Sequence, residues 1–244
     1  IRDVYKRQLL RYRLERYGYG LNVGRQIANN GEIRLGAVQA YGKADVRIGD
    51  PSLPDIDFTE GYYELKYSFD TVDDVNFPHE GEEIGLTMRR YDKSLGSDDS
   101  YRQWDLRLNK ALSFGADTWV FGGGYGRTLD DAEVVTSSFT LGGARELSGF
   151  RRDALSGQNY SLGRIVYYRR LTERSFLPLD FPLYLGGSIE RGRIWNNDNE
   201  YDSGYINAAS LMIGFDTPLG PLTFSYGIND ENFKAFYLNL GQNF

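Results

Sequence analysis

The chain has 244 residues, no cysteine and one histidine, His79, and its formal net charge at pH 7 is −6. Without cysteine it has neither disulfides nor thiolate metal sites, and a single histidine excludes a multi-histidine metal centre. The acidic balance argues against general nucleic-acid binding, which needs a basic face. We therefore expect no metal site, no cofactor and no nucleic-acid partner.

The first residues, IRDVYKRQ, lack an initiating methionine and the apolar core of a signal peptide. We expect residues 1–8 to be a non-native or disordered end, and residues 9–244 to be the C-terminal part of a longer protein. No window approaches 18 consecutive apolar residues, which excludes a transmembrane helix.

Apolar and polar residues alternate in many segments, the first clear one at residues 62–69. There Tyr63, Leu65, Tyr67 and Phe69 alternate with polar neighbours, and residues 104–114, 209–216, 222–228 and 236–244 behave similarly. A period of two is typical of strands. About eleven such segments of roughly ten residues are present, long enough to cross a bilayer when tilted.

This pattern predicts an all-β protein whose antiparallel strands form a transmembrane β-barrel. The polar faces carry full charges such as Asp105, Arg107 and Glu190, and aromatic residues stand at strand ends. Lys110 on an apolar face counts against it, because a lysine facing lipid at the midplane costs about 2–4 kcal/mol. A soluble barrel or sandwich, which would turn its apolar face inward, is the alternative.

An odd strand number has a structural consequence. Bacterial single-chain barrels usually close with an even number of strands, so about eleven leave two unpaired edges. We expect roughly five further strands before this segment, and an open sheet from these residues alone.

Five motifs follow one another in a recognisable order. They are DTVDDVNFPHEGE (70–82), LGGARELSGF (141–150), GSIERGRIW (187–195), GFDTPLGPLTFSYG (214–227) and NLGQNF (239–244). From about residue 12 to 244 the chain resembles the outer-membrane assembly-factor superfamily, which includes BamA, TamA and two-partner-secretion transporters such as FhaC. The resemblance implies a fragment of a sixteen-stranded barrel in the bacterial outer membrane.

The resemblance also implies that a glycine- and arginine-rich loop folds back into the lumen. Most members carry Val-Arg-Gly-Phe/Tyr there, but this chain has Leu-Ser-Gly-Phe at 147–150, with serine in the arginine position. The expected loop residues are Gly142, Gly143, Leu147, Ser148, Gly149, Phe150, Arg151 and Arg152.

The missing arginine raises the question of what anchors the loop. Arg151, Arg152 or Arg145 could take over, and strand parity points Glu190 and Asp216 into the lumen as partners. Forked guanidinium donors match a carboxylate. The alternative is that these arginines are solvated and bind nothing in particular.

The end of the chain resembles the superfamily's insertion signal, which the barrel-assembly machinery binds. The residues concerned are Phe236, Leu238, Leu240, Gly241 and Phe244. They could equally be only lipid-facing residues.

The Leu-Ser-Gly-Phe form is similar to the barrel of patatin-like proteins of the PlpD type. This implies a barrel that anchors or translocates an attached N-terminal lipase domain. The lipase itself is not expected here: Gly186–Glu190 departs from G-x-S-x-G at its last position, and Ser188 fits a lumen-facing strand. The alternative is an insertion or two-partner-secretion factor acting on other polypeptides. Expected partners are outer-membrane lipid and lipopolysaccharide, the barrel-assembly machinery and the attached domain, with a homodimer left open.

Overall fold

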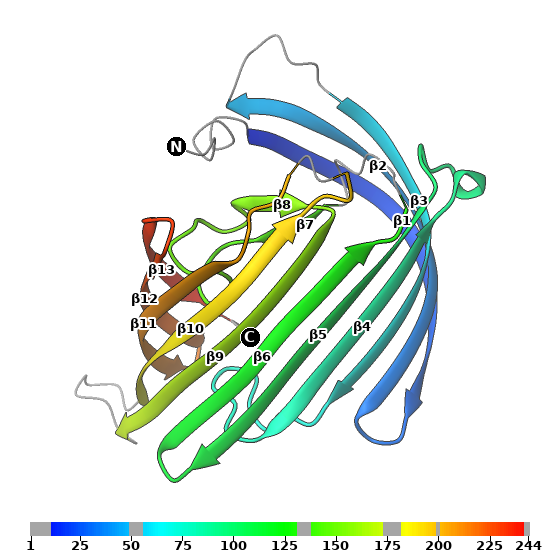
Figure 1. Ribbon diagram of the computed structural model, residues 1–244. Helices are drawn as coiled ribbons and strands as arrows, with labels where there is room; N and C mark the ends of the chain where they lie inside the picture. Colours follow the sequence, from blue (N-terminus) through cyan, green and yellow to red (C-terminus); the bar gives the residue numbers. More distant parts are fainter. Residues whose placement is uncertain (1–10, 49–55, 131–137, 173–181, 199–200, 242–244) are drawn as a thin grey trace.

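The computed structural model describes residues 11–48, 56–130, 138–172, 182–198 and 201–241. Its main sheet is antiparallel and curved, with the strand order β1-β2-β3-β4-β5-β6-β9-β10-β11-β12-β13 (Figure 1). The strands of this sheet are β1 (Arg11–Ile27), β2 (Gly31–Ile48), β3 (Ile56–Asp70), β4 (Gly81–Tyr91), β5 (Tyr101–Phe114), β6 (Asp117–Thr128), β9 (Asn159–Thr172), β10 (Leu183–Trp195), β11 (Ile206–Thr217), β12 (Gly220–Asn229) and β13 (Lys234–Leu240).

Three smaller elements accompany the sheet. The short strands β7 (Phe139–Leu141) and β8 (Leu155–Gly157) pair only with each other among the described residues, and a 3-10 turn, η1, covers Lys93–Leu95. No helix in the described ranges is long and apolar enough to span a membrane.

The number of strands in the main sheet, eleven, confirms the all-β antiparallel prediction. Within the described residues β1 and β13 each pair with one neighbour, so the sheet is open, as expected for this segment. The alternation of the sequence is what builds it, because residues i and i+2 of a strand share one face.

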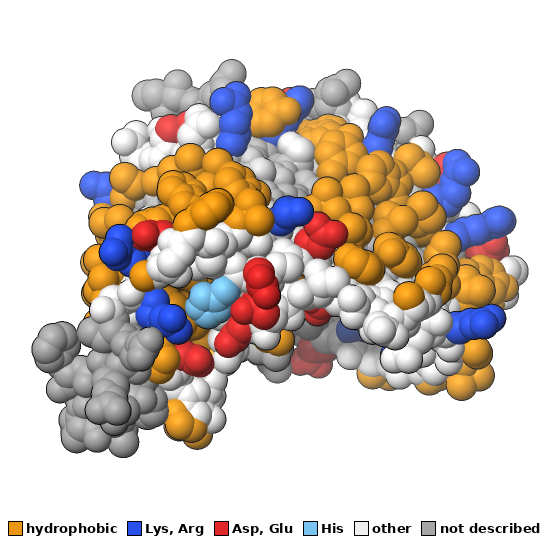
Figure 2. All heavy atoms as spheres, turned by 90° about the horizontal axis from the view of Figure 1, so that it is seen from below, with side chains coloured by type: hydrophobic (Ala, Val, Ile, Leu, Met, Phe, Trp, Pro, Cys, Tyr) orange, Lys and Arg blue, Asp and Glu red, His pale blue; other side chains and the backbone are white. Residues whose placement is uncertain are grey.

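The outer face of the sheet is apolar. Leu108, Phe121, Ile189 and Leu211 come from different strands and are between 45% and 72% exposed. Figure 2, which views the molecule from below, shows hydrophobic side chains in several patches, with charged and polar side chains between them. A soluble barrel would bury such residues, whereas a membrane barrel turns them to lipid. The structure therefore favours the transmembrane arrangement.

The two ends of the sheet differ in their connections. Turns of two or three residues join β1 to β2, β5 to β6 and β11 to β12 at one end, here called the short-turn end. Longer connections join β4 to β5, β6 to β9 and β10 to β11 at the other, the long-loop end. The connection of residues 71–80 between β3 and β4 is a longer one at the short-turn end. Because extracellular loops of bacterial barrels are usually the longer ones, we expect the long-loop end to face outward from the cell.

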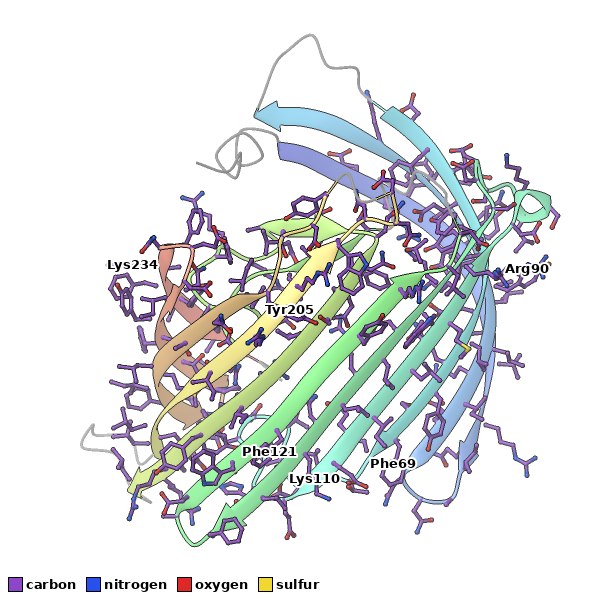
Figure 3. All side chains as sticks on the ribbon, viewed as in Figure 1. Phe69, Arg90, Lys110, Phe121, Tyr205 and Lys234 are labelled. Carbon is purple, nitrogen blue, oxygen red and sulfur yellow. The ribbon has the colours of Figure 1, made fainter. Side chains whose placement is uncertain are left out.

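The lysine that counted against a membrane barrel lies near the short-turn end, not at the middle of the band. Lys110 Nζ is 3.3 Å from Glu82 Oε2 on the neighbouring strand, and Phe121 is its partner in register on β6. Figure 3 shows Lys110 at the same end as Phe69 and Phe121. An ion pair at the interface avoids most of the cost of a buried charge.

The connection between β3 and β4 packs on the inner face of the sheet. Asp73 accepts hydrogen bonds from the N–H of His79 (2.8 Å) and of Glu80 (3.0 Å), and Asp74 accepts from Asn76 N–H (2.6 Å). These acids stabilise the tight backbone of residues 71–80. Asp73 and Asp74 of the DTVDDVNFPHEGE motif are therefore turn-forming carboxylates.

The same turn carries a buried phenylalanine. Phe77 is 1% exposed and stacks on Tyr184 of β10 with the ring centroids 4.1 Å apart. A Cβ added at Gly214 would lie 2.6 Å from the Phe77 ring, so β11 needs glycine there. The hydroxyl of Tyr168 donates to the carbonyl of Pro78. Phe77 thus fastens residues 71–80 to β9, β10 and β11.

Candidate functional site: the loop between β7 and β8

The loop between β7 and β8 lies against the inner face of β10 to β13 and has an irregular backbone. Positive φ angles occur at Gly142 (123°), Gly143 (122°) and Gly149 (100°), and also at Arg145 (66°) and Leu147 (73°). Glycine adopts such angles readily, whereas arginine and leucine do so only where surrounding contacts compensate. The loop is therefore held by its contacts with the sheet.

Two apolar side chains seat the loop. Leu147 is fully buried and Phe150 is 2% exposed, in a cluster that also contains Leu141, Tyr160, Ile194, Ile206 and Ala208. The Phe150 ring lies 4.8 Å from that of Phe233. Burying one such side chain stabilises by about 1.5–3 kcal/mol. The two apolar side chains of the Leu-Ser-Gly-Phe tetrad thus pack on the inner face of the sheet and hold the loop there.

Ser148 binds Glu190 of β10 through two groups. Its backbone N–H donates to Oε2 at 2.6 Å and its hydroxyl donates to Oε1 at 2.7 Å. Ser188 also donates to Oε1, and its hydroxyl lies 2.7 Å from that of Ser210. Glu190 is 4% exposed. A buried carboxylate with this many donors is well satisfied without an arginine at position 148.

The loop approaches the last two strands very closely. A Cβ added at Gly227 of β12 would lie 2.6 Å from Ser148 Cβ, so only glycine leaves room. On β13 the hydroxyl of Tyr237 accepts from Gly149 N–H at 2.8 Å and donates to the carbonyl of Phe150 at 2.5 Å. Sequence reasoning placed Gly227 and Tyr237 on strands but missed their contact with the loop.

Arg145 is the buried cation of the loop. It is 5% exposed, and its backbone N–H donates to the Ser148 hydroxyl at 3.1 Å. Burial and the nearby charge of Arg164, opposed by the charge of Glu190, together lower the pKa of Arg145 to about 10. Of the three candidate arginines, Arg145 is the one whose charge lies near Glu190.

A polar cavity of about 350 Å³ separates the loop from the opposite wall of the sheet. Its lining includes Arg107, Arg145 and Arg164 together with Glu83 and Glu146. Such a mixed lining suits water. The described residues contain no cluster of three or more histidine, cysteine, aspartate or glutamate side chains arranged to hold a metal.

The other two candidate anchors do not reach the wall. Arg151 and Arg152 are exposed, and Arg152 Nε lies 3.8 Å from the carboxylate of the adjacent Asp153. The turn at residues 147–149 points the Ser148 N–H at the carboxylate of Glu190, so Ser148 binds Glu190 directly and Arg145 is the nearby cation.

Asp216, the second expected partner of the loop, does not contact the loop between β7 and β8. It faces the interior, but its carboxylate accepts from Asn76 of the β3–β4 connection at 3.4 Å. Glu190 is in register with Ala208 on β11, and Asp216 lies eight residues farther along that strand. At about 3.3 Å per residue this is about 26 Å away. The alternation of the sequence predicted correctly that Asp216 faces the interior, but it could not predict the position of Asp216 along the barrel axis.

The expected insertion signal lies on the last strand. Phe236, Leu238 and Leu240 share the outer face and are 84%, 65% and 63% exposed. Gly241 follows with a φ of 103°, and its N–H donates to the carbonyl of Pro221 at 3.0 Å. Phe244 lies outside the described residues. Their role as a signal stays a prediction.

Comparison with known proteins decides the family. The model of the Omp85 superfamily domain matches residues 3–244. The chain belongs to the Omp85 superfamily. Membership confirms the resemblance seen in the five motifs, and it places this Omp85 chain in the bacterial outer membrane.

The fold agrees with a solved relative. BamA from Haemophilus ducreyi lacking POTRA domains 1–3 superposes with a TM-score of 0.74 at 14% sequence identity, over 94% of this chain and 53% of that one. This Omp85 chain therefore spans about half the length of the BamA structure. None of the curated proteins compared with the chain matches it.

Proposed function

We propose that this Omp85 barrel moves or inserts polypeptides at the outer membrane, and that the β7–β8 loop is the element that must leave its seat for this to happen. The observation that carries the proposal is the set of contacts between the β7–β8 loop and the inner face of the sheet. Ser148, Leu147 and Phe150 bind the inner face at three neighbouring points, where they occupy space that a passing chain would need.

The docked loop is suited to release because it is held by only a few hydrogen bonds and by the two buried side chains of Leu147 and Phe150. The hydrogen bonds to Glu190 and Tyr237 come from one short stretch, Ser148–Phe150. A loop anchored over so few residues opens as a unit when a competing chain offers equivalent donors.

Locking the loop tests this function. Phe150→Cys with Phe233→Cys introduces the only two thiols in a chain that has no cysteine of its own. A short bis-methanethiosulfonate cross-linker, which forms a disulfide with each thiol and releases methanesulfinate, should stop polypeptide transport by the complete protein in vesicles, and reductive cleavage should restore it. Each single-cysteine variant serves as control. Unchanged transport in the linked protein would show that the loop does not have to move.

A second function rests on the Leu-Ser-Gly-Phe tetrad. The serine that departs from the common tetrad is the residue that binds Glu190, so the departure is accommodated by the wall. This supports a kinship with barrels of PlpD-type patatin-like proteins, in which the polypeptide handled would be an attached lipase domain. The complete reading frame is the test: a patatin G-x-S-x-G domain supports the attached lipase, and tandem POTRA repeats alone support action on other polypeptides.

A further inference from the structure

Aromatic and arginine side chains form a continuous row on the outer face near the long-loop end. Trp104 of β5 lies 5.2 Å from Tyr125 of β6, and Tyr125 lies 6.1 Å from Trp195 of β10, measured between ring centroids. Tyr205, next to the start of β11, continues the row. These four residues, Trp104, Tyr125, Trp195 and Tyr205, are called here the aromatic row.

Arginines join the aromatic row into one surface. The Arg193 guanidinium lies 5.1 Å from the centroid of Trp195 and 5.6 Å from that of Tyr205, and Arg191 lies 4.8 Å from Tyr205. Such cation–π contacts orient the guanidinium plane and leave its edge donors available. Arg127 of β6 is in register with Trp104 and stands on the same face.

The charges along the aromatic row do not cancel. Arg193 is paired with Asp202, its Nε donating at 2.8 Å, and Arg102 is paired with Asp130 at 3.0 Å. Arg127 and Arg191 are exposed, and in the ranges that the structure describes neither is in an ion pair. Arg191 is in register with Asn207 of β11, whose side-chain amide donates to Asp230 at 2.7 Å. Two cations thus remain for an external anion.

The surroundings say what kind of anion this is. Below the aromatic row the outer face continues as an exposed apolar band over several strands, including Leu108, Phe121 and Ile189. Arginines stacked on aromatic rings at the edge of such a band stand at the level of lipid headgroups. A protein partner would have to cover the whole band, whereas lipid covers it by default.

We infer that Arg127, Arg191 and the aromatic row bind the phosphorylated headgroup of the glycolipid in the outer leaflet. Guanidinium groups bind phosphate through paired hydrogen bonds, and the Tyr205 ring beneath Arg191 keeps the donors of that arginine in place. The inference concerns the outer surface and is independent of the transport function proposed above.

Binding of lipid A in mixed detergent micelles to the purified complete protein tests this. The probes are bisphosphorylated lipid A and the same lipid after removal of both phosphates. Arg127→Gln with Arg191→Gln should weaken binding of the phosphorylated form at least about ten-fold, which corresponds to one good charge-assisted interaction. Binding of the dephosphorylated form should be equally weak in wild type and variant.

Two further variants keep the test decisive. Arg169→Gln removes an outer-face arginine at the short-turn end, where Arg169 pairs with Asp117 at 3.2 Å, and should leave binding unchanged. Arg127→Lys with Arg191→Lys keeps both charges but loses the paired donors, so its binding should lie between that of wild type and that of the Gln variant. Equal affinity for both lipids, or an equal loss with Arg169→Gln, would overturn the inference. A dimer that dissociates in the Gln variant without any phosphate dependence would assign the surface to a protein contact instead.

Discussion

Glu190 of β10 accepts two hydrogen bonds from the single residue Ser148, one from its N–H at 2.6 Å and one from its hydroxyl at 2.7 Å. The carboxylate of Glu190 therefore binds the loop through a backbone group as well as a side chain. The backbone hydrogen bond does not depend on which side chain stands at position 148. The predictions below follow from this pair and from its surroundings.

Replacing the acceptor should loosen the loop most. Glu190→Gln removes the charge from a buried, multiply donated group, and bonds to charged groups contribute about 1.5–3 kcal/mol each. We expect the free energy of unfolding to fall by about that amount, measured by urea titration of heat-resistant folded protein. Asp216→Asn is the matched control, because Asp216 lies far from the loop and should cost less than about 1 kcal/mol. Equal effects of the two changes would contradict the assignment.

Removing the hydroxyl alone should cost less. Ser148→Ala keeps the backbone bond to Glu190 and loses the side-chain bond, so we expect about 1 kcal/mol. In a double-mutant cycle, Ser148→Ala combined with Glu190→Gln should be clearly less destabilising than the sum of the single changes. Strict additivity in the urea titration would mean that the two groups do not interact.

The glycine in β12 gives a prediction about loop position. Gly227→Ala puts a Cβ 2.6 Å from that of Ser148 and should push the loop off its seat, whereas at Gly163 an added Cβ meets nothing within 4 Å. Limited trypsin digestion is the measurement, because Arg145 is buried in the seated loop while Arg151 and Arg152 are exposed. Cleavage at Arg145 should rise in Gly227→Ala and stay at the wild-type level in Gly163→Ala.

The β3–β4 connection should respond to acid. Burial favours the neutral form of Asp73, but N–H donation from Glu80 and His79 and the charge of His79 outweigh it and hold the pKa below its ordinary value. A lowered pKa stabilises the folded turn above the unfolded value of about 3.9, and this stability is lost as pH falls through the lower folded pKa. The protection of the His79 and Glu80 amides against exchange, relative to the intrinsic rate at each pH, should therefore fall below about pH 4. Asp73→Asn should exchange faster at neutral pH and lose this pH dependence.

The end of the chain gives a prediction about assembly. If residues 236–244 are the signal for the insertion machinery, Phe244→Asp should block arrival in the outer membrane while synthesis continues. Fractionation of cell membranes with an antibody to the barrel measures this. Phe224→Asp changes an exposed outer-face phenylalanine of β12 and separates loss of a signal from mere loss of lipid contact. Similar defects in both variants would support the simpler lipid-facing role.

The sheet could be read from the sequence because its pattern is repeated in every strand. Alternation assigned Leu108 and Leu211 to the outer face and Ser188 and Glu190 to the inner face, and the register agrees, with Ser188 opposite Ser210. A local period of two is enough for this, because the alternation within a single strand assigns its residues to the two faces without information from neighbouring strands.

The contacts of the loop could not be read in the same way. Alternation says which face a residue occupies but not its height, so Asp216 was grouped with Glu190 although the strand separates them. The hydrogen bonds from Ser148 to Glu190 were missed for a related reason. The direction of the Ser148 N–H depends on positive φ angles at Leu147 and Gly149, and the angle at a leucine has no signal in the sequence.

The seat of the loop is built from residues that come later in the chain than the loop itself. Glu190, Gly227 and Tyr237 belong to β10, β12 and β13, and each is synthesised after Ser148. The loop consequently has nowhere to dock until these strands have been made and paired. Its docking is a late event in the history of each molecule, and a loop that is bound to Tyr237 reports that the last described strand is already in place.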